Sequence, residues 1–308
     1  MQAARVHELG APPTLGDVPE PEGSDGRTAV RVRAVALNPL DLSVAAGRFY
    51  GGHPPLPYVV GCEAVVERED GSRAWFFGDG AGVARDGMLA EHALVVEERL
   101  VPIEEDVDDA TAVALGIAGV VAWSAVERGR IGPGDRVLVL GASGTSGLIA
   151  VQGAKLRGAE RVVGAGRDPQ RLERARELGA DAVVSLDDEL REVCGGDGPT
   201  VVIDPLWDGP VTAAADAAAP HARIVHYGQS AGPEATFASG TVRGKELELL
   251  GVSNFARTRD ELTALHGELL RRARSGDIRI DVETFPLAEI DEAWRRQASG
   301  AKSVVLVV

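Results

Sequence analysis

The chain has 308 residues, 44% of them hydrophobic, which is long for one domain and favours two domains with sizeable cores. Its formal net charge of −15 argues against binding to the phosphate backbone of nucleic acids. The two cysteines, Cys62 and Cys194, exclude a disulfide framework, and neither has the paired spacing of a metal site, so we expect no bound metal.

Neither a secretion signal nor a membrane span is expected from the sequence. The first residues show no positive-then-apolar pattern. The most apolar stretch, residues 110–126, contains Thr111, Gly116, Gly119 and Ser124 and is too short to cross a bilayer comfortably. It predicts one buried helix. We therefore expect a cytoplasmic protein with no membrane partner.

The predicted elements change character along the chain. The first 115 or so residues are rich in glycine and proline, with short alternating runs at 29–35 and 92–96, as is typical of a compact antiparallel β domain. From about residue 118 to 255, apolar strands alternate with amphipathic helices, which predicts a complete doubly wound parallel sheet. Its six strands are expected at 136–140, 161–165, 182–185, 200–204, 222–227 and 247–252.

The C-terminal part is expected to return to the first domain. Helices are predicted at about 258–275 and 288–298, followed by a final strand at 303–308. The fold class is therefore α/β, with one antiparallel β domain and one doubly wound domain.

A glycine-rich turn after the strand at 136–140 is the most informative motif. The strand leads into glycines at three-residue spacing, and an apolar helix follows, which is the phosphate-binding start of a dinucleotide fold. Glycine lets the backbone approach a pyrophosphate, and the helix N-terminus presents free N–H groups to it. The predicted cofactor-binding residues here are Gly141, Ser143, Gly144, Thr145, Ser146 and Gly147.

The end of the next strand indicates which dinucleotide binds. Gly166 and Arg167 stand there, with Arg167 20 residues beyond Gly147. A carboxylate at this point would select NADH, whereas arginine makes room and charge for the 2′-phosphate of NADPH. Asp168 would serve NADH if the turn were shifted by one residue, but before Pro169 it is better placed to cap the next helix. NADPH is therefore the expected cofactor.

Six stretches of the chain resemble the medium-chain dehydrogenase/reductase superfamily, in its zinc-independent NADPH:quinone oxidoreductase-like branch. They are residues 36–42, 59–64, 87–92, 132–139, 178–181 and 300–306. The resemblance extends over nearly the whole chain; it is specific for the superfamily and loose for the substrate. It implies a GroES-like catalytic domain at 1–117 and 256–308, and a Rossmann NADP-binding domain at 118–255.

The departures from zinc-dependent relatives concern the metal ligands. Where those relatives place a cysteine, a histidine and a second cysteine around catalytic zinc, this chain is expected to carry Asn38, Cys62 and Ile117. The cysteine-rich structural zinc lobe is also missing. Without a Lewis acid, hydride addition to an already electrophilic acceptor is the expected chemistry. We interpret Cys62 as a small buried residue rather than a reactive thiol.

The resemblance also implies which residues line the site. Asn38 and Asp41 belong to the segment beside the nicotinamide, where the Asn38 amide could hydrogen-bond the acceptor or the cofactor; the alternatives are a turn at Asn38 and a helix cap at Asp41. Tyr50 is the expected side-chain proton donor, with a rim aromatic or water as alternatives. Further cofactor contacts are expected from Tyr227, Gly228, Ser253, Asn254 and Lys302. The histidines at 53, 92, 221 and 226 are interpreted as ordinary.

Three functions fit these expectations. The first is reduction by NADPH of a quinone or an α,β-unsaturated carbonyl compound. The second is a stand-alone enoyl reductase for carrier-bound or CoA thioesters, whose acyl carrier protein partner would need a basic patch such as Arg271, Arg272, Arg274 and Arg279. The third is a non-catalytic NADPH-binding sensor or scaffold. The apolar strand at 247–253 would be an exposed sheet edge, so a homodimer is also expected.

Overall fold

The computed structural model describes residues 1–23, 26–186, 188–300 and 303–308. Contacts divide the chain into two units. The first comprises Met1–Ala118, Phe255–Arg274 and Ile280–Val308, and the second comprises Gly119–Asn254 and Ser275–Arg279. The short segment Ser275–Arg279 thus joins the second unit, although the sequence-based division places it in the first.

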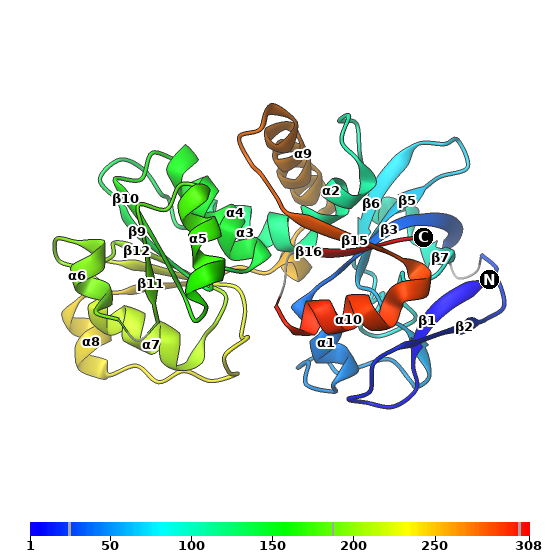
Figure 1. Cartoon of the computed structure of the whole chain (residues 1–308), viewed down its shortest axis with the longest axis horizontal. Coiled ribbons are helices and arrows are strands. Elements are labelled where there is room, and N and C mark those ends of the chain that lie inside the picture. Colours follow the sequence, from blue (N-terminus) through cyan, green and yellow to red (C-terminus); the bar gives the residue numbers. More distant parts are fainter. Residues whose placement is uncertain (24–25, 187, 301–302) are drawn as a thin grey trace. The chain divides into compact units, whose positions relative to one another are not determined.

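The first unit is built on a mostly antiparallel sheet with the strand order β15-β16-β3-β5-β6-β8, and β7 pairs with β3. Figure 1 shows β15 and β16 beside β3, with α10 packed nearby. A smaller sheet has the order β2-β1-β4. The strands are β1 (Gln2–Val6), β2 (Thr14–Asp17), β3 (Thr28–Leu37), β4 (Tyr58–Val59), β5 (Glu63–Glu67), β6 (Arg73–Phe77), β7 (His92–Val95), β8 (Val101–Pro102), β15 (Val282–Pro286) and β16 (Ser303–Val307).

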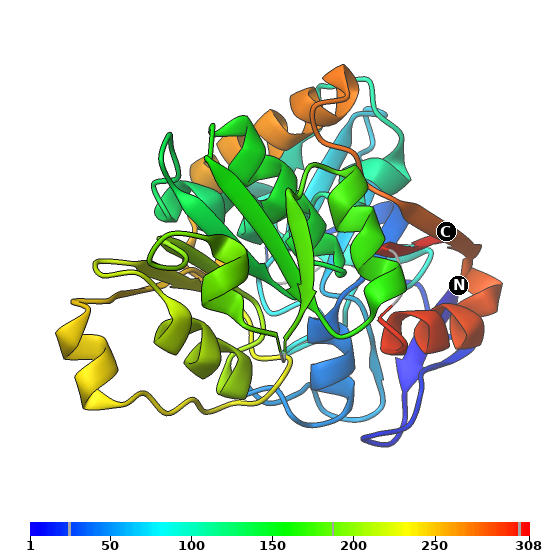
Figure 2. The same cartoon turned by 60° about the vertical axis from the view of Figure 1, so that its left-hand side comes forward.

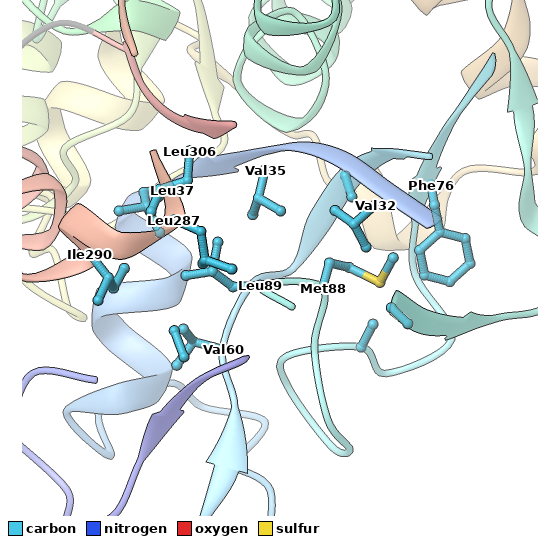
Figure 3. Close-up of a cluster of buried hydrophobic side chains, with 14 of the residues drawn as sticks. Val32, Val35, Leu37, Val60, Phe76, Met88, Leu89, Leu287, Ile290 and Leu306 are labelled. Atoms are coloured by element: carbon cyan, nitrogen blue, oxygen red, sulfur yellow. The ribbon is translucent and has the colours of Figure 1, made fainter. Parts of the chain in front are cut away.

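Helices of this unit come from both ends of the chain. The α-helices are α1 (Pro39–Ala45), α2 (Asp109–Ala114), α9 (Arg259–Ser275) and α10 (Ile290–Ala298), and the 3₁₀ turns are η1 (Glu97–Arg99), η2 (Asn254–Ala256) and η3 (Leu287–Glu289). Two of them cross a unit boundary: α9 ends within the short segment of the second unit, and η2 begins at the last residue of that unit's main segment. The core is closed by residues far apart in sequence. Figure 3 shows it as one cluster that includes Val32, Val35, Leu37, Val60, Phe76, Met88, Leu89, Leu287, Ile290 and Leu306.

The second unit contains a six-stranded parallel sheet with the order β11-β10-β9-β12-β13-β14. Figure 2 shows these strands side by side with helices on both faces. The elements are α3 (Ile117–Arg128), which begins in the first unit, β9 (Arg136–Leu140), α4 (Thr145–Leu156), β10 (Arg161–Gly166), α5 (Pro169–Glu177), β11 (Ala182–Ser185), α6 (Leu190–Cys194), β12 (Val201–Asp204), α7 (Asp208–Ala217), β13 (Arg223–His226), α8 (Ser239–Gly244) and β14 (Glu248–Gly251).

The expected fold class is confirmed by these two sheets. The six predicted strands of the parallel sheet all form, and the final strand β16 pairs with β3 of the first unit, as the sequence predicts. The described part of the chain has no helix with both the length and the apolar character that crossing a bilayer requires.

One prediction about the helices is wrong. The apolar stretch at 110–126 forms two helices, α2 and α3, rather than one. At the junction of the two helices, the backbone N–H of Ile117 donates to Oε2 of buried Glu63 at 2.7 Å. A Cβ at Gly116 would overlap Glu63 and lie 2.5 Å from Nε1 of Trp75, so the chain passes this point only as glycine.

Candidate functional site

The glycine-rich turn of the second unit forms between β9 and α4. Gly141 has φ +61°, a left-handed conformation that favours glycine, and its carbonyl accepts from the N–H of Gly144 at 3.0 Å. Gly144 precedes the first residue of the twelve-residue helix α4. Ser143, Gly144, Thr145 and Ser146 are all partly accessible. The turn therefore presents polar groups and the positive end of a helix dipole at the carboxyl edge of the sheet.

Arg167 and Asp168 have separate roles at the end of β10. Oδ1 of Asp168 accepts from the backbone N–H groups of Gln170 at 3.0 Å and Arg171 at 3.2 Å, so it caps α5 as the sequence suggests. Arg167 is exposed, and the preceding Gly166 is buried. A Cβ at Gly166 would lie 3.5 Å from Oγ of Ser143, which places the β10 end directly beside the glycine-rich turn.

Tyr227 and Gly228 follow β13 at the same edge of the sheet. Burial raises the pKa of the Tyr227 phenol, and an interaction with the Ser146 side chain partly opposes that rise. Among the described residues, none completes a hydrogen bond of good geometry with this buried hydroxyl. Two residues predicted to bind the cofactor, Ser146 and Tyr227, therefore lie together, with a polar atom that a ligand could satisfy.

The remaining predicted cofactor residues are less closely gathered. Ser253 is exposed just beyond β14, whereas Asn254 is only 6% exposed and begins η2. Lys302 lies outside the described residues. A polar pair that sequence reasoning missed stands closer to the turn. Nδ1 of His226, at the end of β13, is 2.9 Å from Oδ2 of buried Asp204, at the end of β12.

In the first unit, Asn38 and Asp41 belong to the local structure around α1. The Asp41 carboxylate accepts from the backbone N–H of Asn38 at 2.7 Å and from that of Cys62 at 2.9 Å. Asp41 is 2% exposed, and burial raises the pKa of its carboxyl group. Both oxygens are thus used to hold backbone, which matches the helix-cap alternative.

A buried glutamate that the sequence analysis did not single out organises this region. Glu63 is fully buried; Oε1 accepts from Nδ2 of Asn38 and Oε2 from Nε1 of Trp75, each at 2.7 Å. Oε2 also accepts from the Ile117 N–H. Burial raises the pKa of Glu63 to about 8, because desolvation outweighs these donors.

The Glu63 contacts limit what Asn38 can do. Nδ2 of Asn38 donates to Glu63 and, at 3.2 Å, to the carbonyl of Ala36. Both amide N–H groups are therefore used within the unit. The amide oxygen faces the backbone of Asp41 in the capping box of α1, and its second lone pair can accept from a ligand. Two of the positions that the resemblance equates with zinc ligands, Asn38 and Ile117, both donate to Glu63, and the third, Cys62, is its chain neighbour. Burial raises the pKa of the Cys62 thiol well above its usual value, which disfavours the thiolate form that a reactive cysteine needs.

Tyr50 is the most accessible of the predicted catalytic residues. Its side chain is 79% exposed and lies against Phe49, with 4.4 Å between ring centroids. Phe49 in turn lies 6.2 Å from Phe255, which is 47% exposed. The tyrosine hydroxyl is thus open to solvent beside an apolar surface that a flat, apolar molecule could contact.

Comparison with known proteins gives a consistent set of relatives. A family model described as zinc-binding dehydrogenase matches residues 147–269. The chain is 29% identical, over its whole length, to a phenolphthiocerol/phthiocerol polyketide synthase component of Mycobacterium tuberculosis, but spans only 14% of that protein's length.

Two further relatives match over their whole length or nearly so. The 2-haloacrylate reductase of a Burkholderia species is 29% identical, with 100% of this chain and 99% of the relative covered. Among solved structures, the quinone oxidoreductase of Thermus thermophilus, also solved in complex with NADPH, has a TM-score of 0.85 and 28% identity, and each chain is fully covered.

Proposed function

Because the chain belongs to the medium-chain dehydrogenase/reductase superfamily, in its quinone oxidoreductase-like branch, we propose that it is an NADPH-dependent reductase. Its proposed acceptor is a quinone or an α,β-unsaturated carbonyl compound. The names of two relatives, quinone oxidoreductase and 2-haloacrylate reductase, support this acceptor class, because both substrates are electrophilic before they bind.

The glycine-rich turn fits the proposed cofactor. The turn leaves no side chain at Gly141, Gly144 or Gly147, and the buried Tyr227 hydroxyl beside Ser146 lacks a well-formed partner among the described residues. We propose that residues 141–147 hold the pyrophosphate with their backbone N–H groups and that Gly228 lets the chain pass close to the nicotinamide half. NADPH bound there would supply the hydride.

The observation that carries the choice of NADPH is the division of roles between Arg167 and Asp168. The Asp168 carboxylate is occupied as the cap of α5, while the exposed Arg167 stands immediately after β10. This arrangement supplies positive charge, and no free carboxylate from Asp168, where the adenosine ribose binds in such folds. We therefore propose that Arg167 recognises the 2′-phosphate.

Replacing Arg167 by alanine is expected to weaken NADPH binding by about 10- to 100-fold, the range for a charge-assisted hydrogen bond, and to change NADH binding less than about twofold. Binding is measured by titration of nucleotide fluorescence, and turnover by nucleotide oxidation with a panel of quinones, enals, enones and enoyl thioesters. Arg174→Ala is the matched control, because Arg174 lies further along α5 and pairs with Glu177 at 2.7 Å.

The same panel separates the proposed functions. An equal loss of NADPH and NADH binding in Arg167→Ala would refute the 2′-phosphate assignment. Tight NADPH binding without turnover of any acceptor would favour a sensor or scaffold. Turnover abolished by a chelator would contradict our proposal of a metal-independent enzyme, which rests on an amide at Asn38 and an aliphatic side chain at Ile117, where the zinc-dependent relatives place cysteine ligands.

The chain's own residues are proposed to orient the acceptor and deliver the proton. Asn38 offers its amide oxygen, fixed by Glu63, and Asp41 keeps a positioning role by holding the backbone of Asn38 and Cys62. Tyr50 is the proposed proton donor, because its hydroxyl exchanges freely with solvent beside the apolar rings of Phe49 and Phe255.

An enoyl reductase for carrier-bound thioesters is the second candidate. The match of the whole chain to part of a polyketide synthase favours it. The basic patch expected for an acyl carrier partner is weakened by internal pairing, since Arg272 contacts Glu268 and Arg274 contacts Glu105, each at 2.8 Å. Arg279 belongs to the other unit. Preference for enoyl thioesters over quinones in the panel would favour this candidate.

A homodimer is proposed from the edge strand of the parallel sheet. Within the described residues, β14 pairs only with β13, and its Leu249 is 55% exposed. Leu249→Lys is expected to convert a dimer to a monomer in gel filtration with light scattering, without loss of helical content. Leu156→Lys, at a 42% exposed leucine on α4, is the control. A monomeric wild type, or a dimeric Leu249→Lys, would contradict the proposal.

A further inference from the structure

A histidine–aspartate pair lies at the carboxyl edge of the parallel sheet, where sequence reasoning expected an ordinary histidine. Asp204 and His226 are the last residues of the adjacent parallel strands β12 and β13 and stand directly opposite each other in register. We propose that His226, oriented by Asp204 and Trp207, hydrogen-bonds the nicotinamide-side ribose of the nucleotide. The inference rests on the proposed function.

Asp204 fixes the orientation of the His226 imidazole through its Nδ1 atom. Its carboxylate is fully buried; Oδ1 accepts from the backbone N–H groups of Leu206 at 2.8 Å and Trp207 at 3.0 Å. Oδ2 lies 2.9 Å from Nδ1 of His226. A carboxylate that only accepts requires a proton on Nδ1, so in the singly protonated tautomer the lone pair lies on Nε2. The pair therefore presents one free acceptor nitrogen.

Trp207, whose own backbone is strained, packs against the imidazole ring of His226. Its backbone has φ 63° and ψ −162°, a region that is essentially restricted to glycine, and Asp208 follows with φ 55°. Its indole ring packs against His226, with 4.0 Å between centroids, and against Phe237 at 5.8 Å. Strained backbone persists only where the surrounding structure enforces it. Here the enforced backbone conformation accompanies a tryptophan ring packed on the histidine.

The position of the pair indicates which half of a dinucleotide it meets. β12 and β13 lie on one side of β9, and β10, which ends just before Arg167, lies on the other. Dinucleotides bind across this switch point with one mononucleotide half on each side. His226 immediately precedes Tyr227, whose buried hydroxyl lies beside Ser146 of the glycine-rich turn. The histidine therefore faces the half that does not carry the adenosine 2′-phosphate.

The chemistry of Nε2 selects a hydroxyl donor. The His226 side chain is 27% exposed, and the described residues provide no hydrogen bond to Nε2, so it is accessible to a ligand. With Nδ1 carrying the proton, Nε2 of this tautomer can accept a hydrogen bond from a sugar hydroxyl, and the carboxylate behind the ring strengthens that acceptor. NADPH and NADH carry the same ribose at this end, so the contact does not discriminate between them.

His226→Asn and Asp204→Asn are expected to weaken NADPH and NADH about equally, by about 3- to 10-fold for one neutral hydrogen bond. Binding of 2′,5′-ADP, which lacks the nicotinamide half, is expected to stay unchanged. His221→Asn is the matched control, because His221 is exposed and pairs with Glu246 at 3.1 Å. Thermal unfolding of each variant shows whether the unit is intact.

A direct readout separates a ligand contact from a structural role. In ¹⁵N-histidine spectra of the wild type, Nε2 of His226 is expected to shift when NADPH is added and to stay in place with 2′,5′-ADP. An unmoved Nε2 with NADPH, or an equal loss of 2′,5′-ADP binding in His226→Asn, would overturn the inference. A wild type that binds no nucleotide would refute the proposed function instead.

Discussion

Replacing Glu63 by glutamine is expected to lower the free energy of unfolding by about 1–3 kcal/mol at pH 5. The glutamate receives donors on both oxygens, from Asn38 on one and from Trp75 and Ile117 on the other. A glutamine must direct its own NH₂ at one of them, so at least one buried donor loses its acceptor. In the protonated wild-type carboxyl group the hydroxyl oxygen keeps a lone pair and can still accept, whereas the amide nitrogen of glutamine cannot.

The same residue makes wild-type stability depend on pH. In the folded state Glu63 has a pKa of about 8, against 4.5 for an ordinary glutamate, because its burial disfavours the charge. Between these values the folded state holds a proton that the unfolded state has released. The contribution of this proton to the free energy of unfolding is therefore fully present below pH 4.5. It falls by up to about 1.4 kcal/mol per pH unit as the pH rises, and it is lost by about pH 8.

Chemical unfolding at intervals from pH 5 to 9 measures both effects. The wild-type curve is expected to fall with rising pH relative to that of Glu63→Gln, which lacks the titrating group. Asp41, whose pKa burial also raises, is present in both proteins, so its own titration contributes to both curves. Glu67→Gln, at the other end of β5, is the matched control and should keep the wild-type slope. Parallel curves for the wild type and Glu63→Gln would contradict the assignment.

Replacing Gly147 by alanine is expected to abolish nucleotide binding and to destabilise the second unit by about 1–3 kcal/mol. The new Cβ would overlap the carbonyl oxygen of Gly141 and lie 2.8 Å from Cα of Ala142. Both neighbours are backbone, which cannot rotate away as a side chain can. Helix α4 must therefore shift away from the end of β9, and its N–H groups move with it.

Gly144→Ala tests the space against the turn without changing the backbone geometry of the turn. A Cβ at Gly144 would lie 3.5 Å from the Gly141 carbonyl oxygen, an ordinary contact, and its φ of −90° suits any residue. This variant should fold with wild-type stability and lose affinity only if the nucleotide lies against the turn. Thermal unfolding measures the stability of the variant, and nucleotide titration measures its affinity. Full NADPH binding by Gly147→Ala would refute the placement of the pyrophosphate.

The strands and the glycine-rich turn between β9 and α4 could be predicted because their signals are local. β9 and β11 form at the expected residues, since a run of β-branched or apolar residues specifies a buried strand by itself. The cap at Asp168 is also local, because it depends on the next three residues. Such features can be predicted without knowing the partner element.

The features that could not be predicted depend on distant residues. The break between α2 and α3 lies where the Ile117 N–H donates to Glu63, which is 54 residues away in the sequence, and nothing within the apolar run indicates that contact. The pairing of Asp204 with His226 follows from strand register. One signal was available, because both residues end consecutive predicted strands of a parallel sheet, and such ends meet at one edge.

The strand order of the first unit has a consequence for how the polypeptide is made. β16 lies between β15 and β3 in the sheet, so the ribosome releases residues 28–37 long before their neighbour at 303–307 exists. The parallel sheet, by contrast, is encoded almost without interruption. During synthesis the parallel-sheet unit can therefore form while the first unit still lacks β15 and β16, the strands that extend its sheet beyond β3.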